Sequence, residues 1–367
     1  MSIFRRKQKG ILGIDFGAGG MKVIQLSSGD GKGTLFTYGF AEFSPEDTSM
    51  EYLENPQGAG ALLKRVCQQA KTTVSIAVAA LPIPTVFSAV VAIPSVPQKE
   101  LASAVQWEAK KLIPLPLEEV VLDFKVLKRP LPPKNPNTPA GAETGKAKMP
   151  EKTIECLLTA APKSIIEKYI ATAKGAGITL VSLETEAFAL IRALLGNDPT
   201  PSVIVDIGAL RSNILMVDHG IPMLSRSVEV GGKKCTEAIA QSLKIGLGQA
   251  EQMKRDAGTS PLSGTSRGVL PEIVREVLQP LINELRYSFN VYRSRATIAR
   301  PPERILLTGG GAGIPGLAEF MGSEFNLQAF LGNPWERVTF HPDLKDTLYG
   351  FGTKFSVAIG LALKTNS

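Results

Sequence analysis

Histidine and cysteine are scarce in this chain of 367 residues, and their scarcity excludes several kinds of chemistry. The two histidines, His219 and His341, are isolated from one another, so we assign neither of them a catalytic role. The three cysteines, Cys67, Cys156 and Cys235, are also far apart, and none belongs to a C-x-x-C pair. A zinc site or a disulfide framework is therefore not expected, and the pattern is typical of a reducing compartment.

Long apolar runs are also missing. No stretch approaches the ~20 residues that a membrane-spanning helix needs, and the start of the chain lacks the apolar run of a signal peptide. We therefore expect a soluble cytoplasmic protein. Four basic residues lie at positions 5, 6, 7 and 9, within a formal net charge of +7. Such a cluster can contact anionic lipid or nucleic acid, but four charges are few, so we expect a solvated tail and no nucleic-acid partner.

The overall composition is that of a globular protein large enough for two domains. Hydrophobic residues make up 44% of the chain and charged residues 20%, which supports a large core without covalent cross-links. Residues 129–152 are an exception, since they are rich in proline, glycine, lysine and asparagine and contain few apolar residues. Such a segment cannot bury enough surface to become ordered, so we predict a flexible and dispensable loop there.

Three apolar runs are each followed by a glycine-rich turn. Residues 11–14 lead into DFGAGGMK (15–22, the first turn), residues 202–205 into DIGA (206–209, the second turn), and residues 304–307 into GGGAGIP (309–315, the third turn). Short apolar runs bounded by glycine predict buried strands. An extended pattern resumes after the first and second turns, so each of these two is expected to join a pair of strands.

The three turns have the chemistry of a nucleotide site. Glycines allow backbone N–H groups to close around phosphate oxygens, and Lys22 can reach a phosphate from the strand after the first turn. Asp15 and Asp206 can hold a hydrated Mg²⁺ between them, since Mg²⁺ keeps most of its water ligands. A helix beginning near Pro315 would direct its positive end towards the ligand.

Each turn taken singly also has a purely structural explanation. Asp-x-Gly is a common β-turn, and Gly309–Gly311 could form a plain loop. The recurrence of the pattern after three apolar strands nevertheless favours one shared nucleotide cleft.

Further segments resemble one known family. They are AKKLIPLPLEEVVLDF at 109–124, LETEAFAL at 183–190, VGG at 230–232 followed by Thr236, AEQMK at 250–254, and LLTGGGA at 306–312. The first turn also pairs an aspartate with a lysine seven positions later, as actin does. The sequence therefore resembles the actin-like superfamily and, within it, the PilM family of type IV pilus assembly. The resemblance extends over residues ~10–365 and rests on the combination, because no single motif is specific.

The resemblance implies an α/β actin-like ATPase fold, in which two lobes each contain a mixed sheet flanked by helices and a nucleotide cleft lies between them. After a basic tail over residues 1–9, we expect the first lobe over 10–200. The second lobe is expected over 201–367, with a terminal helix at about 353–364 that packs back on the fold. A subdomain over about 86–176 is expected where the cell-division relative FtsA also has an insertion.

The resemblance also implies roles towards ATP and Mg²⁺. Asp15 and Asp206 are the expected metal ligands, and Glu186 is expected to position the attacking water if ATP is hydrolysed. The other expected nucleotide contacts are Gly17, Ala18, Gly19, Gly20, Lys22 and Gly208 for the phosphates, Gly231, Gly232, Glu251 and Lys254 for the ribose and base, and Gly309, Gly310 and Gly311 for the adenosine floor.

Structural explanations stay open for some of these assignments. Glu186 could be a charge on a helix surface, Glu251 and Lys254 could form an ordinary ion pair within one helix, and the glycine pair at 231–232 could be only a turn.

The first and second turns depart from those of the heat-shock relatives, which carry hydroxyl side chains there. This chain has Ala18 and Gly19 in the first turn and Arg211 near the corresponding place in the second, although Ser212 is adjacent. Because such hydroxyls help to order phosphate and water, we expect ATP binding with at most slow hydrolysis.

The implied function is that of an ATP-binding cytoplasmic scaffold of type IV pilus assembly, or of a related secretion system, at the inner face of the inner membrane. The expected partners are the cytoplasmic N-terminal tail of a PilN-type membrane protein and other pilus assembly components, with peripheral membrane association through the partner. The resemblance places the tail on the first lobe and its inserted subdomain.

Two other functions stay open. A sugar or small-molecule kinase of the same fold needs a carboxylate base and a polar sugar-binding set, and no such cluster stands near the three turns. A membrane-associated filament protein like FtsA needs an amphipathic terminal helix, whereas the apolar segment 355–363 fits the closing core helix of the fold better.

Overall fold

The computed structural model describes residues 10–27, 33–127, 153–256, 271–294 and 300–364. The chain divides into two compact units, of which the smaller is Thr85–Ile165 and the larger comprises the residues before and after it. The basic tail expected over 1–9 and the flexible loop expected over 129–152 lie outside the described residues.

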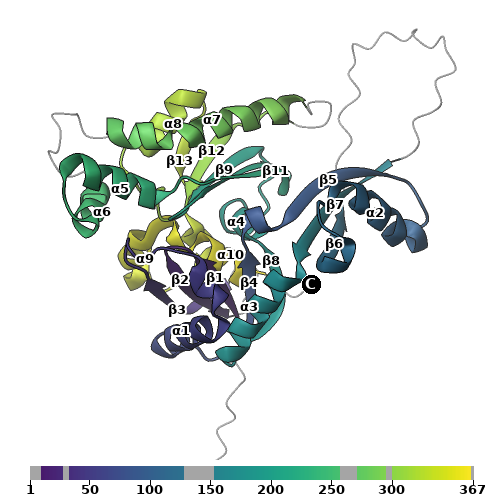
Figure 1. The fold of residues 1–367 in the computed structure, drawn as a ribbon, viewed down its shortest axis with the longest axis horizontal. Coiled ribbons are helices and arrows are strands. Elements are labelled where there is room, and N and C mark those ends of the chain that lie inside the picture. The colour runs from purple at the N-terminus through teal and green to yellow at the C-terminus, as the bar shows by residue number, and fades with distance from the viewer. Residues whose placement is uncertain (1–9, 28–32, 128–152, 257–270, 295–299, 365–367) are drawn as a thin grey trace, which may run out of the picture. The chain divides into compact units, whose positions relative to one another are not determined.

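The larger unit contains two mixed sheets (Figure 1). The strands of the first sheet are β1 (Gly10–Gly17), β2 (Gly20–Ser27), β3 (Gly33–Glu42), β4 (Ile76–Leu81), β8 (Thr179–Thr185) and β14 (Val338–Thr339), in the order β14-β3-β2-β1-β4-β8. The first three strands form an antiparallel meander, and β4 and β8 continue the sheet in parallel beyond β1.

The second sheet repeats this plan. Its strands are β9 (Ser202–Ile207), β10 (Ser212–Asp218), β11 (Ile221–Val228), β12 (Arg304–Thr308) and β13 (Gln328–Leu331), in the order β11-β10-β9-β12-β13. Again three strands form an antiparallel meander, and β12 and β13 continue in parallel beyond the first of them. The first strand of each meander therefore leads directly into an Asp-x-Gly turn.

Helices pack on both sheets of the larger unit. They are α1 (Pro56–Gln69), α3 (Lys163–Gly175), α4 (Glu186–Leu194), α5 (Gly232–Leu243), α6 (Leu247–Asp256), α7 (Glu272–Ser294), α8 (Leu317–Phe325), α9 (Lys345–Phe351) and α10 (Ser356–Ala362). Short 3-10 helices are η1 (Glu51–Glu54), η2 (Ile83–Thr85), η4 (Pro334–Arg337), η5 (Pro342–Leu344) and η6 (Gly352–Phe355). α1 packs against β2 and β3, α7 against β10 and β11, and α8 against β12 and β13. No helix of the described ranges is long and apolar enough to cross a membrane.

The smaller unit is a three-stranded antiparallel sheet with one main helix. Its elements are β5 (Phe87–Pro94), α2 (Gln98–Leu112), η3 (Leu117–Glu119), β6 (Val120–Val126) and β7 (Thr153–Pro162), with strand order β5-β7-β6. Val105 of α2 and Leu158 of β7 lie in its core. The expected insertion ran to residue 176, whereas this unit ends at Ile165. The reason is that α3 buries Tyr169 in the larger unit, edge-on to Phe16 with ring centres 5.2 Å apart.

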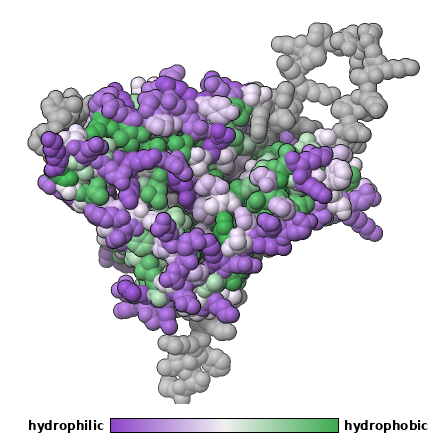
Figure 2. Space-filling model, viewed as in Figure 1, coloured by the Kyte–Doolittle hydropathy of each residue, from purple (hydrophilic) through white to green (hydrophobic). Residues whose placement is uncertain are grey.

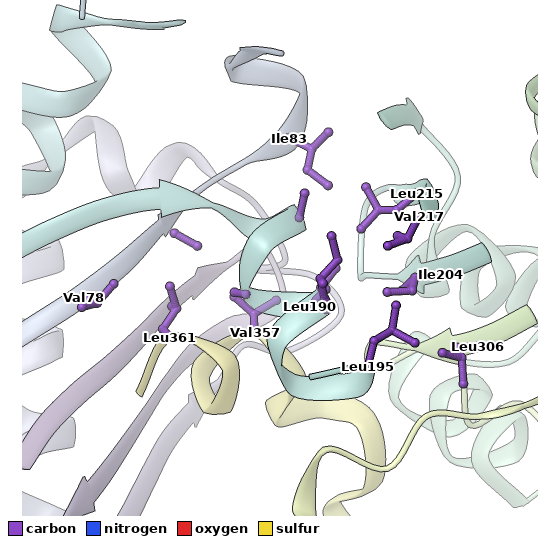
Figure 3. Close-up of a cluster of buried hydrophobic side chains, with 14 residues drawn as sticks. Val78, Ile83, Leu190, Leu195, Ile204, Leu215, Val217, Leu306, Val357 and Leu361 are labelled. Carbon is purple, nitrogen blue, oxygen red and sulfur yellow. The ribbon is translucent and has the colours of Figure 1, made fainter. Parts of the chain in front are cut away.

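The two sheets of the larger unit are joined by a hydrophobic cluster around α4 and α10 (Figure 3). Leu190 of α4 and Leu361 of α10 meet Val78 of the first sheet and Ile204 and Leu306 of the second. All seven residues of α10 are buried. The face of the molecule in Figure 2 is mainly hydrophilic, with separate hydrophobic patches.

The end of the described chain belongs with the first sheet and not with the second lobe that we expected to continue to residue 367. β14 pairs with β3, and α10 packs against β1. The terminal helix expected at about 353–364 is in fact η6 followed by α10. The physical reason is that Phe355 and Ile359 bury their side chains against Ile24 and Leu26 of β2.

Candidate functional site

The first turn is the tip of the hairpin formed by β1 and β2. Asp15 lies opposite Lys22 in the register of these strands, and Nζ of Lys22 donates a hydrogen bond to Oδ2 of Asp15 over 3.1 Å. Gly17 lies opposite Gly20, which leaves residues 18–19 as the two-residue tip. The lysine that we expected at a phosphate therefore neutralises the first aspartate.

The second turn has the same construction with an amide in place of the lysine. Asn213 lies opposite Asp206, and its Nδ2 donates to Oδ2 of Asp206 over 3.1 Å. The Ser227 hydroxyl donates to Oδ1 of Asn213 over 2.6 Å and so fixes the amide orientation. Asn213 was not among the predicted site residues. The sequence spacing could have predicted Asn213, because it follows Asp206 by seven residues, as Lys22 follows Asp15.

Ser212 cannot supply the hydroxyl that the second turn otherwise lacks. Successive side chains of a strand point to opposite faces, and Ser212 is buried on the face opposite to Arg211 and Asn213. Its hydroxyl donates to the carbonyl of Val230 over 2.6 Å. The amide of Gly208 is also engaged, since it donates to the carbonyl of Arg211 over 2.9 Å.

The third turn fixes the position of Asp206. Thr308 of β12 lies opposite Asp206 of β9, and the next residue, Gly309, has a φ of +85°. A Cβ atom at Gly309 would lie 2.4 Å from Oδ1 of Asp206. Only glycine therefore combines this left-handed backbone with a close approach to the carboxylate.

The two aspartates both line the cleft and influence one another electrostatically. Burial raises the pKa of Asp206, and the hydrogen bond from Asn213 opposes this rise while the negative charge of Asp15 adds to it. The charges of Arg211 and Lys22 lower the pKa in turn, but Asn213 is the only hydrogen-bond partner of this carboxylate among the described residues. A buried carboxylate with a neutral partner favours a cation beside it. Within the described ranges, no group of three or more His, Cys, Asp or Glu side chains is placed to hold a metal.

Glu186 is the first residue of α4 and is buried, so its interpretation as a surface charge is wrong. Its Oε2 accepts hydrogen bonds from the amide of Ile83 over 3.1 Å and from Asn213 over 3.3 Å. Its Oε1 accepts one from Arg211 over 3.2 Å. Burial raises the pKa of Glu186 to about 7; Arg211 opposes the rise, whereas Asp206 and Asp15 add to it.

Glu251 and Lys254 are an ion pair within α6, and they also connect α6 to α5. Nζ of Lys254 lies 2.6 Å from Oε2 of Glu251, 3.0 Å from the carbonyl oxygen of Gly232 and 2.8 Å from the Thr236 hydroxyl. Burial would raise the pKa of Glu251, but the hydrogen bonds and charge of Lys254, together with Thr236 and Arg255, lower it. The pair therefore holds its charges inside the cleft wall.

These elements enclose a cleft of about 200 Å³ in the larger unit. Every predicted site residue lines this cleft except Gly231, which packs behind it against the carbonyl of Ala209. The lining residues that the sequence did not single out include the polar residues Glu42, Thr48, Asn213, Lys233, Arg255, Thr353 and Lys354. Most of them come from segments without a glycine motif, so no local signal marks them. α8 begins at Leu317, close to the start near Pro315 that we expected, but none of its residues is among those that line the cleft.

Comparison with known proteins gives the same fold over the full length. A chain in the PilM-PilN type IV pilus biogenesis complex is 28% identical and superposes with a TM-score of 0.78, covering 97% of this chain and 98% of that one. The ethanolamine utilization protein EutJ from Carboxydothermus hydrogenoformans is 16% identical, with a TM-score of 0.51 and coverage of 96% and 88%. The MamK double helical filament gives 13% identity, a TM-score of 0.50 and coverage of 96% and 98%. The last two likenesses concern the fold alone.

The sequence itself matches the family model of the type IV pilus assembly protein PilM over residues 13–366. That range includes both Asp-x-Gly turns, the third turn, α4 and α10. The fold is the expected α/β actin-like fold, with a mixed sheet in each lobe. This chain therefore belongs to the PilM family of type IV pilus assembly proteins, within the actin-like superfamily.

Proposed function

We propose that this protein is a cytoplasmic scaffold of type IV pilus assembly, or of a related secretion system, which binds ATP with Mg²⁺ and holds a PilN-type membrane protein. The observation that carries the proposal is the full-length likeness to a chain of the PilM-PilN complex, at 28% identity and a TM-score of 0.78. The cleft chemistry supports the nucleotide part of the proposal independently.

The first turn offers the best contacts for phosphate. Among the described residues, the amides of Ala18 and Gly19 make no hydrogen bond, and both residues line the cleft. Lys22 stands on the strand that follows and is held 3.1 Å from Asp15. Free backbone N–H groups next to a lysine are a common arrangement for polyphosphate binding. Gly208 would leave room for the phosphates but would not donate a hydrogen bond to them, because its amide is already bonded within the second turn.

The other predicted residues fit the nucleoside end. Lys254 and Glu251 border the cleft beside Gly232, and Gly309–Gly311 line it as well. The polar side chains suit the hydroxyl groups of a ribose, while the glycine backbone leaves room for a flat base.

The two aspartates fit a divalent cation. Among the residues that the structure describes, buried Asp206 has only the neutral Asn213 amide as a hydrogen-bond partner, and Asp15 raises its pKa further. A cation between the two carboxylates would therefore remove an unfavourable charge arrangement. Two carboxylates suffice for Mg²⁺, which retains several water ligands. When bound, Mg²⁺ would neutralise phosphate charge and orient the phosphate chain. Asp15 and Asp206 would hold it, and Lys22 would then be released from Asp15 towards the phosphates.

The contacts of Glu186 favour binding over hydrolysis. A general base needs a free, ionised carboxylate within reach of the water it activates. Here both carboxylate oxygens already accept hydrogen bonds, and burial places the pKa of Glu186 at about 7. The hydroxyl groups that could order water are absent from the tip of the first turn, and Ser212 points away. We therefore propose at most a slow ATPase.

The partner we propose is the cytoplasmic N-terminal tail of a PilN-type protein, with other assembly components bound in turn. Peripheral membrane association would come through this partner, which would place the protein at the inner face of the inner membrane. Nucleotide would influence the partner only through a difference in affinity between protein conformations.

The two alternative functions are not favoured. A filament protein anchored like FtsA needs an amphipathic helix that is free to leave the fold, whereas every residue of α10 is buried between the sheets. The kinase alternative has no support from the family match, which names a pilus assembly protein.

The test is a calorimetric titration of the protein with ATP, with and without Mg²⁺, followed by titration with the tail peptide. We expect Mg²⁺-dependent ATP binding, loss of the Mg²⁺ dependence in Asp206→Ala, and tighter peptide binding in one nucleotide state. ATP at ~100 times its Kd should also stabilise the fold by about 2.7 kcal/mol.

Three results would count against parts of this proposal. Equal ATP affinity with and without Mg²⁺ would refute the metal assignment. Equal peptide affinity in both nucleotide states, measured beside a scrambled peptide, would leave a scaffold without nucleotide coupling. Turnover near ~10 per second with a sugar present would instead favour a kinase.

A further inference from the structure

The charged side chains of the cleft form a nearly complete set of ion pairs. Six cationic and five acidic residues line it. The pairs are Lys22 with Asp15, Arg211 with Glu186, Lys254 and Arg255 with Glu251, and Lys354 with Glu42. Within the described part of the chain, Lys233 is the one cleft cation without a carboxylate at ion-pair distance, and Asp206 is the one carboxylate without a cation. The unpaired carboxylate of Asp206 favours binding of a cation, and the unpaired ammonium group of Lys233 favours binding of an anion.

Lys233 is also held at the meeting point of the two turns. It is the second residue of α5, and its amide donates to the carbonyl of Ala209 in the second turn over 2.9 Å. The first turn is in contact there, since a Cβ atom at Gly19 would lie 3.0 Å from the Cβ of Ala209. A phosphate chain held by both turns would thus end near this lysine.

The side chain of Lys233 crosses from one lobe to the other. Its Nζ lies 3.3 Å from the carbonyl oxygen of Thr48, which is a long hydrogen bond to a neutral acceptor. Thr48 is itself fixed to the first turn, because the amide of the next residue, Ser49, donates to the carbonyl of Ala18 over 3.2 Å. The lysine therefore bridges the segments attached to the two turns.

We propose that Lys233 is the specificity-determining residue that distinguishes a nucleoside triphosphate from a diphosphate in this cleft. The proposal rests on the nucleotide function proposed above and assigns a role within the same site. A terminal phosphate is a charged acceptor, and hydrogen bonds to it are shorter and about twice as strong as those to a neutral carbonyl. With a triphosphate, Nζ leaves Thr48 for the terminal phosphate; with a diphosphate, it stays on Thr48.

Lys234 offers a matched control. It has the same charge and stands on the same helix, but it is exposed and does not line the cleft. The experiment measures the affinities for Mg²⁺-ATP and Mg²⁺-ADP by calorimetry in the wild-type protein and in Lys233→Met, Lys233→Arg and Lys234→Met. The melting temperature of each ligand-free variant is recorded as well.

We expect Lys233→Met to reduce the preference for ATP over ADP by about tenfold, equivalent to about 1.4 kcal/mol, and to leave ADP affinity nearly unchanged. Lys233→Arg should keep most of the preference because it keeps the charge, and Lys234→Met should keep all of it. Ligand-free melting temperatures should agree within a few degrees, since only a long bond to a carbonyl is lost. If Lys233→Met unfolds, Lys233→Gln replaces it, and the same expectations apply.

An unchanged ratio of ATP to ADP affinity in Lys233→Met would overturn the inference and leave the proposed function intact. An equal loss of ATP and ADP affinity would also overturn it, because Lys233 would then serve phosphates that both nucleotides share. A wild-type protein that binds neither nucleotide would overturn both the inference and the proposed function.

Discussion

Replacement of Glu186 by glutamine should remove a large pH-dependent contribution to the stability of the protein. The buried carboxyl has a pKa of about 7 in the folded protein, against 4.5 as its ordinary value. The folded state therefore binds this proton more tightly than the unfolded state does. The corresponding contribution to stability is fully present below pH 4.5 and is lost as the pH rises to about 7.

The difference between the two pKa values corresponds to about 3 kcal/mol, since each unit of pKa is worth 1.36 kcal/mol. Glutamine does not titrate, so Glu186→Gln should lack this loss. An offset independent of pH is also expected, because the amide can still accept from Ile83 and Asn213 but can present an N–H group to Arg211. The slope with pH is thus the informative quantity, and the absolute stability at one pH is not.

The assay is urea unfolding of the ligand-free protein between pH 5 and pH 8, in the presence of a metal chelator. The free energy of unfolding of the wild-type protein, relative to that of Glu186→Gln, should fall by about 2.5 kcal/mol over this range, because part of the contribution is already lost at pH 5. Glu237→Gln, an exposed position on α5, should follow the wild-type profile. Parallel profiles for wild type and Glu186→Gln would refute the reasoning, because the carboxyl would then titrate equally in the folded and unfolded states.

Two further substitutions test the core and the third turn. Leu190→Ala, in the cluster of Figure 3, should lower the free energy of unfolding measured with urea by about 2–5 kcal/mol. The control Leu243→Ala, at a half-exposed site, should lower it by less than about 0.5 kcal/mol. Equal effects would contradict the assignment of the core that joins the two sheets. Gly309→Ala and Gly220→Ala both force alanine into a positive φ, at a cost of about 1–2 kcal/mol each. Only Gly309→Ala places a Cβ atom against Asp206, so only this variant should weaken Mg²⁺-nucleotide binding, by more than about tenfold in calorimetry. A similar loss of affinity in both variants would count against a steric clash with Asp206 as the cause.

The sequence was most informative where a single short segment contains the whole signal. An apolar run followed by a glycine turn is such a segment, and it located the strands that bear Asp15 and Asp206. Asn213 could have been found in the same way from its spacing. By contrast, the ion pair of Lys354 with Glu42 joins residues 312 positions apart, and nothing near either residue indicates the other.

Edge strands and boundaries were also beyond the reach of local patterns. β13 and β14 contain only four and two residues, so they have no periodicity to recognise, and their pairing is decided by the neighbouring strand. The return of the chain to the first sheet depends on Phe355 and Ile359 finding Ile24, which is a tertiary contact. Local secondary-structure propensity could not show whether the end of the chain packs on the first sheet or continues in the second lobe.

The position of α10 has a consequence for synthesis of the protein on the ribosome. Ile24 and Leu26 of β2 are covered by residues of η6 and α10, which are translated more than 300 residues later, as the 312-residue separation of Glu42 and Lys354 shows. At a translation rate of ~5–20 residues per second, the helix that covers the first sheet is synthesised roughly 15–60 s after the strands it covers. During that time the apolar face of the sheet is open to chaperones and to other nascent chains. The amino-terminal lobe is therefore made first but completed last. A chain interrupted after β13 would contain every strand of the first sheet except β14, yet it would lack the residues that complete the core of this lobe.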